Sequence, residues 1–356
     1  MRFTPERIKQ EIVSPTRKIT KTFLDFIHGG FGLRLKKNTR RNQKYSLIWD
    51  IRSNPVTFDF IWLIIATSNH VNKYTNKNFD VILYLPSEFT PKPFTFGNYN
   101  EYVSSEDIIQ RIDDLIIPLV NAFNCVDEIL VIKRRDELLD LISKRNIFPV
   151  NYKPSVYYPY SFDYPKTVQS LNKLEESRIP YLISEEYINP DVINDLSREY
   201  MTLTIRDYGF IPERNTTSDD IKAFSELADF LNVIPIIIPD EISKLKEYNL
   251  PSNMLISFDS RLSISKRIKL YSKSIVNIFT PSGPFYSSLF CRGTKSIVYN
   301  MKFFNGEKPG KYGYYDGDQP YIKLAGYILW RSSYKKLTFN ELYSAYEILK
   351  RRKESL

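Results

Sequence analysis

Short apolar runs rich in β-branched residues alternate with longer amphipathic segments along most of this 356-residue chain. Residues 46–51 (SLIWDI) and 79–86 (FDVILYLP) predict buried strands. Between them, residues 56–74 predict a mostly apolar helix that Ser53 or Asn54 caps. A strand, helix and strand in close succession form a βαβ unit, which requires a parallel sheet with helices on its faces. Further helices are predicted over 104–123, 135–145, 218–232 and 263–274, and further strands over 128–133, 233–240, 275–280 and 296–301.

A proline- and tyrosine-rich segment, residues 151–166, interrupts this alternation and cannot form a regular helix. It is typical of a linker or of an aromatic-lined surface. A second βα series then begins with a predicted strand over 201–206. We therefore predict an α/β protein with two Rossmann-like domains facing across a cleft, followed by a C-terminal amphipathic helix. The predicted parts are a leader (1–44), a first domain (45–165), a connecting segment (166–199), a second domain (200–335) and the C-terminal helix (336–356).

The excess positive charge of the chain lies in its leader. The net charge is +9, and residues 1–44 alone contain 12 Lys+Arg against 3 Asp+Glu. Because apolar residues such as Ile19 and Phe23 are interspersed with these charges, the leader predicts either an amphipathic helix packed on the body or peripheral attachment to an anionic membrane surface. The alternative is a nucleic-acid-binding protein that uses this leader. Against it, the neutral body has no helix-turn-helix, zinc-finger or RNP pattern.

Composition limits the chemistry that the chain can perform. Its two cysteines, Cys125 and Cys291, exclude a disulfide framework and a cysteine-rich zinc site, and its two histidines argue against a histidine-rich metal site. We expect no metal and no cofactor. The longest apolar stretch, residues 58–67, is too short to span a bilayer, and no secretory signal fits the N-terminus. The expected location is the cytoplasm, either free or at the inner face of the membrane.

Residues that suit phosphate binding follow two predicted strands of the second domain, at the ends where open α/β sheets bind their ligands. Arg206 ends the first of these strands, and Arg214 and Asn215 follow in the same loop. Guanidinium groups offer paired donors to phosphate oxygens, and the next helix adds its N-terminus. The other place is the turn PSGP (281–284), where Gly283 lets backbone N–H groups approach an anion. Arginine-bearing loops are usually solvated or structural, and the turn can equally be a tight strand-to-helix connection without a ligand.

Two candidates for a general base lie in the first part of the chain. Asp50, at the end of the first predicted strand, can take a proton from an acceptor hydroxyl, or it can pair with Arg52 and shape the turn. His28 lies in a glycine-rich loop that can cross the cleft, although a lone histidine is more often structural. His70, on the first predicted helix, is expected to be structural.

Several of these motifs together resemble a group of bacterial GT-B glycosyltransferases of surface-polysaccharide biosynthesis, with a fucosyltransferase-like donor domain. The resemblance lies in LIWDIRSNPVTFDF (47–60), TIRDYGFIPERN (204–215), IIIPD (236–240), RIKLYSKSIVNIFTPSGP (267–284) and GDQ (317–319). It implies that the second domain binds a nucleotide-sugar donor and that the first binds most of the acceptor. Ile205 and Thr216 stand where the group more often has leucine and serine.

The resemblance also implies roles for individual residues. Arg206 would bind the donor pyrophosphate, and Arg214 and Asn215 would support its loop. The amides of Ser282 and Gly283 would hold the distal phosphate. The remaining donor-binding residues implied are Asp240, Pro284 and Gln319. GT-B enzymes generally neutralise the diphosphate with protein cations and helix dipoles. Asp316-Gly317-Asp318 is interpreted as a loop and not as a metal-binding motif, because it lies in a turn-rich segment without the apolar strand that normally precedes such a motif.

The sequence therefore predicts a metal-independent glycosyltransferase of hexosyl type. It would move a sugar from a nucleotide-sugar donor to a cell-surface glycan or a lipid-linked acceptor. A GT-B-fold sugar-nucleotide epimerase or a non-catalytic glycan-binding protein is the alternative. Epimerases usually need more acid and base groups than two histidines and scattered carboxylates offer.

Overall fold

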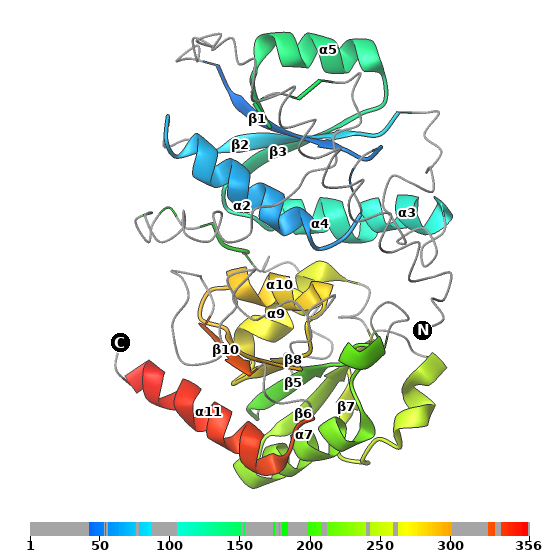
Figure 1. Ribbon diagram of the computed structural model, residues 1–356, viewed down its shortest axis with the longest axis vertical. Helices are drawn as coiled ribbons and strands as arrows, with labels where there is room; N and C mark the ends of the chain where they lie inside the picture. The colour runs from blue at the N-terminus through cyan, green and yellow to red at the C-terminus, as the bar shows by residue number, and fades with distance from the viewer. Residues whose placement is uncertain are drawn as a thin grey trace, which may run out of the picture.

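The computed structural model shows two α/β domains, one above the other in Figure 1. It describes residues 43–52, 54, 56–75, 78–86, 105–150, 152–153, 174, 178, 180–183, 198–207, 212–239, 243–258, 263–300, 327–331 and 336–354. Within this part of the chain, one parallel sheet lies between residues 45 and 148 and the other between residues 200 and 331. The predicted architecture of two Rossmann-like domains with a C-terminal helix is confirmed.

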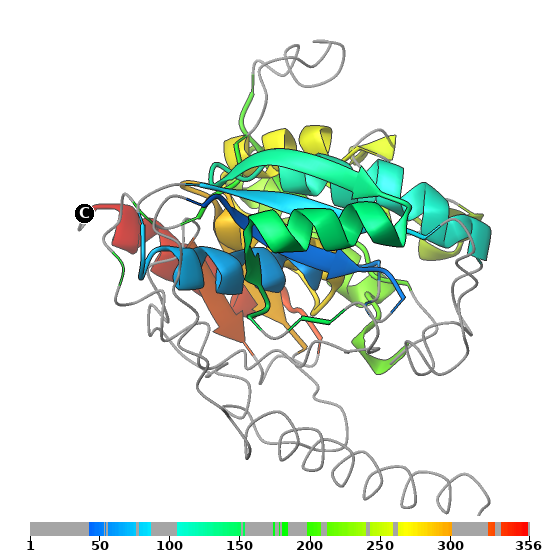
Figure 2. The ribbon, with the colours of Figure 1, turned by 90° about the horizontal axis from the view of Figure 1, so that it is seen from above.

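The first domain contains a parallel sheet with the strand order β3-β2-β1-β4. Its elements are β1 (Tyr45–Asp50), α2 (Phe60–Val71), β2 (Phe79–Tyr84), α3 (Ser105–Arg111), η2 (Ile112–Ile116), α4 (Ile117–Asn121), β3 (Val126–Ile132), α5 (Arg135–Lys144) and β4 (Asn146–Phe148). Because side chains alternate along a strand, Leu47 and Trp49 pack toward α2 and α4, whereas Ile48 packs toward α5. Figure 2 shows α5 lying across the outer face of this sheet.

The second domain contains a parallel sheet with the strand order β10-β9-β8-β5-β6-β7. Its elements are β5 (Tyr200–Thr204), η4 (Pro212–Arg214), α7 (Ser218–Leu231), β6 (Ile234–Ile238), η5 (Ser243–Tyr248), β7 (Leu255–Ile256), α9 (Ile264–Lys273), β8 (Asn277–Phe279), α10 (Gly283–Phe290), β9 (Lys295–Tyr299), β10 (Tyr327–Arg331) and α11 (Phe339–Glu354). Helices α9 and α10 cover one face, and α7 and α11 cover the other. This is the strand order of a dinucleotide-binding Rossmann domain.

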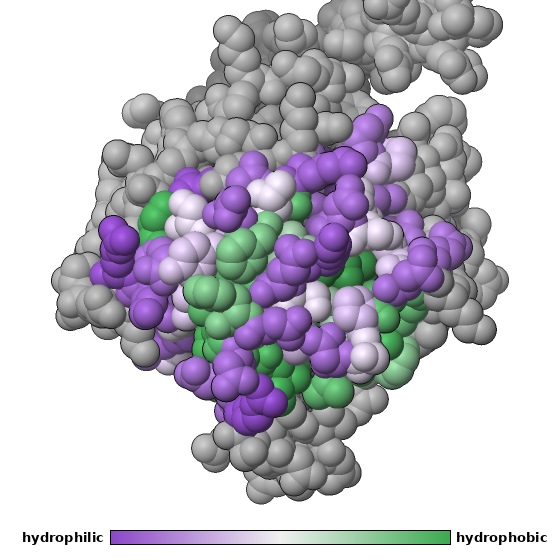
Figure 3. All heavy atoms as spheres, turned by 90° about the horizontal axis from the view of Figure 1, so that it is seen from below, coloured by the Kyte–Doolittle hydropathy of each residue, from purple (hydrophilic) through white to green (hydrophobic). Residues whose placement is uncertain are grey.

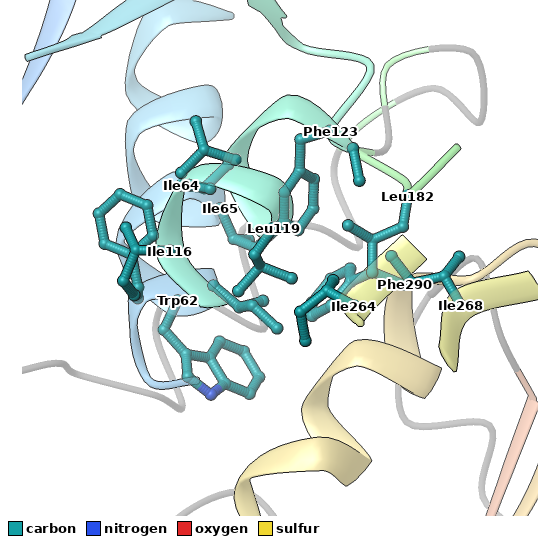
Figure 4. Close-up of a cluster of buried hydrophobic side chains, with 14 of the residues drawn as sticks. Trp62, Ile64, Ile65, Ile116, Leu119, Phe123, Leu182, Ile264, Ile268 and Phe290 are labelled. Atoms are coloured by element: carbon teal, nitrogen blue, oxygen red, sulfur yellow. The ribbon is translucent and has the colours of Figure 1, made fainter. Parts of the chain in front are cut away.

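One apolar core joins the two domains. It contains side chains from α2 and α4 of the first domain and from α9 and α10 of the second. Figure 4 shows Trp62 and Leu119 beside Ile264 and Phe290, and the ring centroids of Trp62 and Phe290 are 5.9 Å apart. Because this core is continuous, the arrangement of the domains is part of the folded structure.

A short connecting stretch, residues 180–183, binds both domains through its backbone. Leu182 N donates to Phe290 O of the second domain over 2.9 Å, and Ile183 N donates to Ala122 O of the first domain over 2.7 Å. The guanidinium of Arg292 lies 3.9 Å from the ring centroid of Tyr181. These hydrogen bonds and this cation–π contact join the two domains in addition to the shared apolar core.

The first helix begins later than the sequence predicts. Helix α2 starts at Phe60, and its N-cap Asp59 makes no side-chain capping bond. Asn54 instead donates from Nδ2 to Asp50 O over 2.8 Å, and Thr57 donates from Oγ1 to Asp59 Oδ2 over 3.2 Å. Capping by Asn54 is therefore wrong, because this side chain stabilises the strand-to-helix turn; Ser53 lies outside the described residues.

Figure 3 shows the molecule from below, and this face carries both polar and apolar side chains. Helices α7 and α11 lie on this side of the structure. Phe230 is 60% exposed, and its ring packs against Phe339 and Tyr343 at centroid distances of 5.6 and 5.2 Å.

Among the described residues, no helix has both the length and the hydropathy needed to cross a membrane.

Candidate functional site

The strand order of the second domain reverses between β5 and β8. From β5 the chain adds β6 and β7 on one side, and then β8, β9 and β10 on the other. Ligands of open α/β sheets bind beyond the carboxyl ends of the two strands at this switch point. Thr204 and Phe279 are Cα partners in these strands, so Arg206 and Pro281 each follow two residues later at the same edge. The structure thus brings together the two predicted phosphate-binding segments.

Arg206 is held rigidly at this edge. Its side chain is 6% exposed, and its backbone N–H donates to Thr216 Oγ1 over 3.0 Å, while Thr216 N donates back to Arg206 O over 2.9 Å. The guanidinium Nη1 donates to Asn215 Oδ1. A buried guanidinium places positive charge in a medium where it acts strongly on an anion. The resembled group more often has serine at position 216, and Thr216 supplies the same hydroxyl as acceptor for Arg206 N.

The loop that carries these residues ends in a capping box. Thr217 Oγ1 accepts from Asp220 N over 3.3 Å, and Asp220 Oδ2 accepts from Thr217 N over 2.8 Å. Asp220 Oδ1 also accepts from Leu337 N over 2.7 Å, which connects the start of α7 to the segment before α11. Arg214 lies half-buried in η4, one residue before Asn215. The cap fixes the place where the loop containing Arg214 and Asn215 ends.

The second predicted segment is the turn from β8 into α10. Ser282 is the extended N-cap of this eight-residue helix, and Pro284 lies in its first turn. The hydroxyl oxygens of Thr280 and Ser282 are buried, and neither has a hydrogen-bond partner within the described chain. A buried hydroxyl without a partner costs about 1–3 kcal/mol, and the first N–H groups of a helix lack intrahelical acceptors. Together these groups form a set of donors that suits a bound anion.

Gly283 is required by a close approach within the protein. A Cβ on Gly283 would lie 2.6 Å from Cδ2 of Phe58, which belongs to the β1–α2 loop of the first domain. The contact with Phe58 is a second reason for glycine at this position, beside the approach of an anion that the sequence predicts. The backbone amide of Gly283 remains at the N-terminus of α10.

This close approach predicts a stability effect with a specific rescue. Gly283→Ala is expected to cost about 1–3 kcal/mol of unfolding free energy, because the new methyl group overpacks against Phe58. Adding Phe58→Ala removes the obstructing ring, so Gly283→Ala should then cost much less. Urea unfolding of the two single variants and the double variant measures this coupling. Additive effects would contradict the contact.

Asn300 is a residue of this region that the sequence did not predict. It follows β9 in a left-handed conformation with φ 52°, is 4% exposed, and donates from Nδ2 to Glu213 O over 2.8 Å. Glu213 lies in η4, directly before Arg214 and Asn215. Asn300 therefore fixes the loop whose Asn215 binds the guanidinium of Arg206. An asparagine directly after an apolar strand was the available signal, since asparagine tolerates positive φ.

The role of Asn300 can be tested with a matched control. Asn300→Gly keeps the backbone conformation but removes the bond to Glu213, and one hydrogen bond contributes about 0.5–1.5 kcal/mol. Nucleotide affinity should fall by up to about tenfold. Asn249 also has positive φ (45°) and is exposed, so Asn249→Gly should leave the affinity unchanged. Equal affinities of both variants in calorimetric titration would contradict this role.

Asp50 at the end of β1 is engaged in a buried ion pair. Its Oδ1 accepts from Arg52 N and Nε over 3.1 and 2.9 Å, and its Oδ2 accepts from Arg52 Nη2 and Tyr152 Oη over 2.6 and 2.8 Å. The hydrogen bond to Asp50 raises the pKa of Arg52. The carboxylate is 1% exposed. The alternative that Asp50 pairs with Arg52 and shapes the turn is what the structure supports, so we do not retain Asp50 as the general base.

The structure does not describe several of the other sequence candidates. His28, Asp240, Gln319 and residues 316–318 lie outside the described residues, as does the leader up to residue 42. His70 packs against the rings of Tyr45, Tyr74 and Phe148, and burial lowers its pKa. Burial raises the pKa of the Cys125 thiol to about 12, which argues against a nucleophilic thiolate there. Across the described ranges, no group of three or more His, Cys, Asp and Glu side chains could hold a metal ion.

Comparison with known proteins gives distant structural likenesses. No protein-family model matches the sequence, and no curated protein matches it. ADP-heptose LPS heptosyltransferase II of E. coli is 12% identical, with a TM-score of 0.48 over 87% of this chain and 99% of the other. E. coli heptosyltransferase WaaC with ADP is 8% identical, with a TM-score of 0.45 over 86% and 99%. Both TM-scores are below 0.5.

Proposed function

We propose that this protein is a glycosyltransferase that moves a sugar from a nucleotide-sugar donor to a cell-surface glycan or a lipid-linked acceptor. The observation that carries the proposal is the meeting of buried Arg206 and the Thr280–Gly283 turn at the switch point of a Rossmann sheet. A guanidinium, two hydroxyls without partners and a helix N-terminus suit a diphosphate. The motif resemblance favours transfer of a hexosyl group over other diphosphate chemistry.

The proposed chemistry is electrostatic. The acceptor oxygen bonds to the anomeric carbon of the sugar, the bond from that carbon to the diphosphate oxygen breaks, and its electron pair leaves with the nucleoside diphosphate. Arg206 and the first turn of α10 stabilise the charge that develops on this leaving group. Protein cations and a helix N-terminus would do so without a metal ion. His28 is proposed as the base that takes the acceptor proton, and Asp240 and Gln319 as further donor contacts.

A panel of nucleotides tests this function. Thermal unfolding is measured with UDP, GDP, CMP and ADP, each with and without magnesium. A nucleotide at about 100 times its dissociation constant adds about 2.7 kcal/mol of stability. We expect one nucleotide to stabilise the protein equally well with and without magnesium. If none of UDP, GDP and ADP stabilises the protein, the proposed transfer from a nucleoside-diphosphate sugar fails, and strict dependence on magnesium would overturn its metal-independent form.

We further propose that the leader attaches the protein peripherally to the inner face of the membrane. Each Lys or Arg near an anionic surface contributes about 1 kcal/mol, and the leader holds 12 such residues. Replacing Lys36, Lys37, Arg40 and Arg41 by glutamine should therefore release the protein from phosphatidylglycerol vesicles in a sedimentation assay. Glutamine at Lys222, Lys336, Lys350 and Arg351, which are exposed on the body, provides the control. Equal release of both variants would refute a specific role of the leader.

A further inference from the structure

We propose that Phe58 of the first domain is a positioning residue for the phosphate-binding turn of the second domain. The inference rests on the proposed function, because it assigns to Phe58 an effect on the bound diphosphate. Phe58 itself would not touch the reacting atoms. It would act through Gly283, the first residue of α10.

The contact between Phe58 and the turn is unusually close. An ideal Cβ on Gly283 would lie 2.6 Å from Cδ2 of Phe58 and 3.2 Å from both its Cβ and Cγ. Side chains do not normally approach a Cβ this closely, so the phenyl ring lies directly against the backbone of Gly283. The amide there belongs to the group of helix N–H donors that the proposed function assigns to the distal phosphate.

Phe58 is held firmly by its own domain. Its carbonyl oxygen accepts from Ile61 N over 3.0 Å at the start of α2, a helix whose side chains are almost all buried. The preceding turn is fixed by Asn54, which donates from Nδ2 to Asp50 O over 2.8 Å. Because Phe58 extends from a rigid loop, it can transmit the position of the first domain to the turn.

Ring contacts of the residues that follow Gly283 also hold the first turn of α10 in place. Phe285 is 2% exposed, and its ring centroid lies 6.3 Å from that of Phe279 on β8. Tyr286 contacts Trp62 of α2, with ring centroids 5.6 Å apart. Aromatic contacts from both domains thus surround the segment that starts at Gly283. Loss of Phe58 would remove the contact closest to the donor amides.

The consequence is a coupling between the domain interface and one phosphate of the donor. If the ring of Phe58 sets the position of the Gly283 amide, its removal should weaken binding of the phosphate held by that amide and spare the rest of the nucleotide. Removal of a residue with only a structural role would lower stability, but it would change the affinities for a nucleoside diphosphate and for its monophosphate alike. This difference separates positioning from simple packing.

The test compares two ligands across three variants. The ligand is whichever of ADP, UDP, GDP and CDP binds the unsubstituted protein most tightly in calorimetric titration, together with its own monophosphate. Phe58→Ala should weaken the diphosphate by about tenfold and leave the monophosphate unchanged. Phe58→Leu should recover part of the loss and serves in its place if the alanine variant does not fold. Leu119→Ala removes a fully buried side chain from the same interdomain core and should not change the ratio of the two affinities.

Each result decides the proposal. Equal weakening of both ligands by Phe58→Ala, unchanged affinities, or the same change of ratio in Leu119→Ala would overturn it. If none of the four diphosphates binds the unsubstituted protein, the proposed function fails, and the inference falls with it. A failure confined to the substituted protein leaves the proposed function intact and removes only the role of Phe58.

Discussion

Replacing Arg206 by alanine is expected to lower turnover by about 100-fold or more, because in the proposed reaction it removes a preorganised charge donor from the departing diphosphate. The guanidinium is buried at the switch point and oriented by Asn215, so neither water nor a neighbouring residue can reproduce its position. Arg206→Lys should recover little of the activity, since an ammonium group lacks the planar pair of donors. Steady-state kinetics with the donor that matches the stabilising nucleotide measures both effects.

Arg198 provides a matched control on the same sheet. It lies two residues before β5, at the opposite edge from Arg206, and its Nη2 donates to Asn232 O and Oδ1 over 3.1 and 2.8 Å. Arg198→Ala removes an exposed arginine at the opposite end of β5, away from the switch point, and should keep normal turnover. Near-normal rates in Arg206→Ala, with both variants folded, would refute the assignment of the diphosphate to Arg206.

The second large effect concerns stability. Asp50→Ala is expected to lower the unfolding free energy by about 3–5 kcal/mol, as breaking one side of a buried ion pair does. Arg52, only 18% exposed in its side chain, would lose its carboxylate partner, and Tyr152 would lose its acceptor. Urea unfolding with a constant m value measures the loss.

A second substitution, Asp50→Asn, distinguishes a structural role of Asp50 from a catalytic one. Asp136 forms an exposed pair with Arg134, so Asp136→Ala should leave the unfolding midpoint nearly unchanged. If Asp50→Asn kept the stability of the unsubstituted protein but lost turnover, Asp50 would be a base after all. If stability and turnover fall together, the carboxylate shapes the β1–α2 turn.

Most strands could be predicted from the sequence, including the three-residue β8 (Asn277–Phe279), but β4, β7 and β10 could not. Apolar runs at β1, β2, β5 and β6 carry enough buried residues to be distinctive, because both faces of a parallel sheet are covered. In contrast, β4 (Asn146–Phe148) has three residues and β7 (Leu255–Ile256) has two. Such strands exist because β1 and β6 offer unpaired edges, which is a tertiary property.

The sequence predicted residues of the candidate site that are polar and lie near the ends of apolar strands. Arg206, Asn215 and Ser282 were predicted because polar residues stood at the ends of apolar strands, and the structure places all three at the switch point. Phe58 and Asn300 were not predicted, since their contacts with Gly283 and Glu213 join segments more than eighty residues apart. The sequence therefore indicated the donors and the local support from Asn215, but not the contacts that distant segments make with them.

A crystal structure with the nucleoside diphosphate that stabilises the protein would locate the donor site. We expect the diphosphate to lie between the Arg206 guanidinium and the first turn of α10, with its oxygens within hydrogen-bond distance of Thr280 or Ser282. The same soak of Arg206→Ala should show no ordered diphosphate. A diphosphate bound at any other place, with Arg206 still engaged only by protein groups, would show that the switch point is not the donor site.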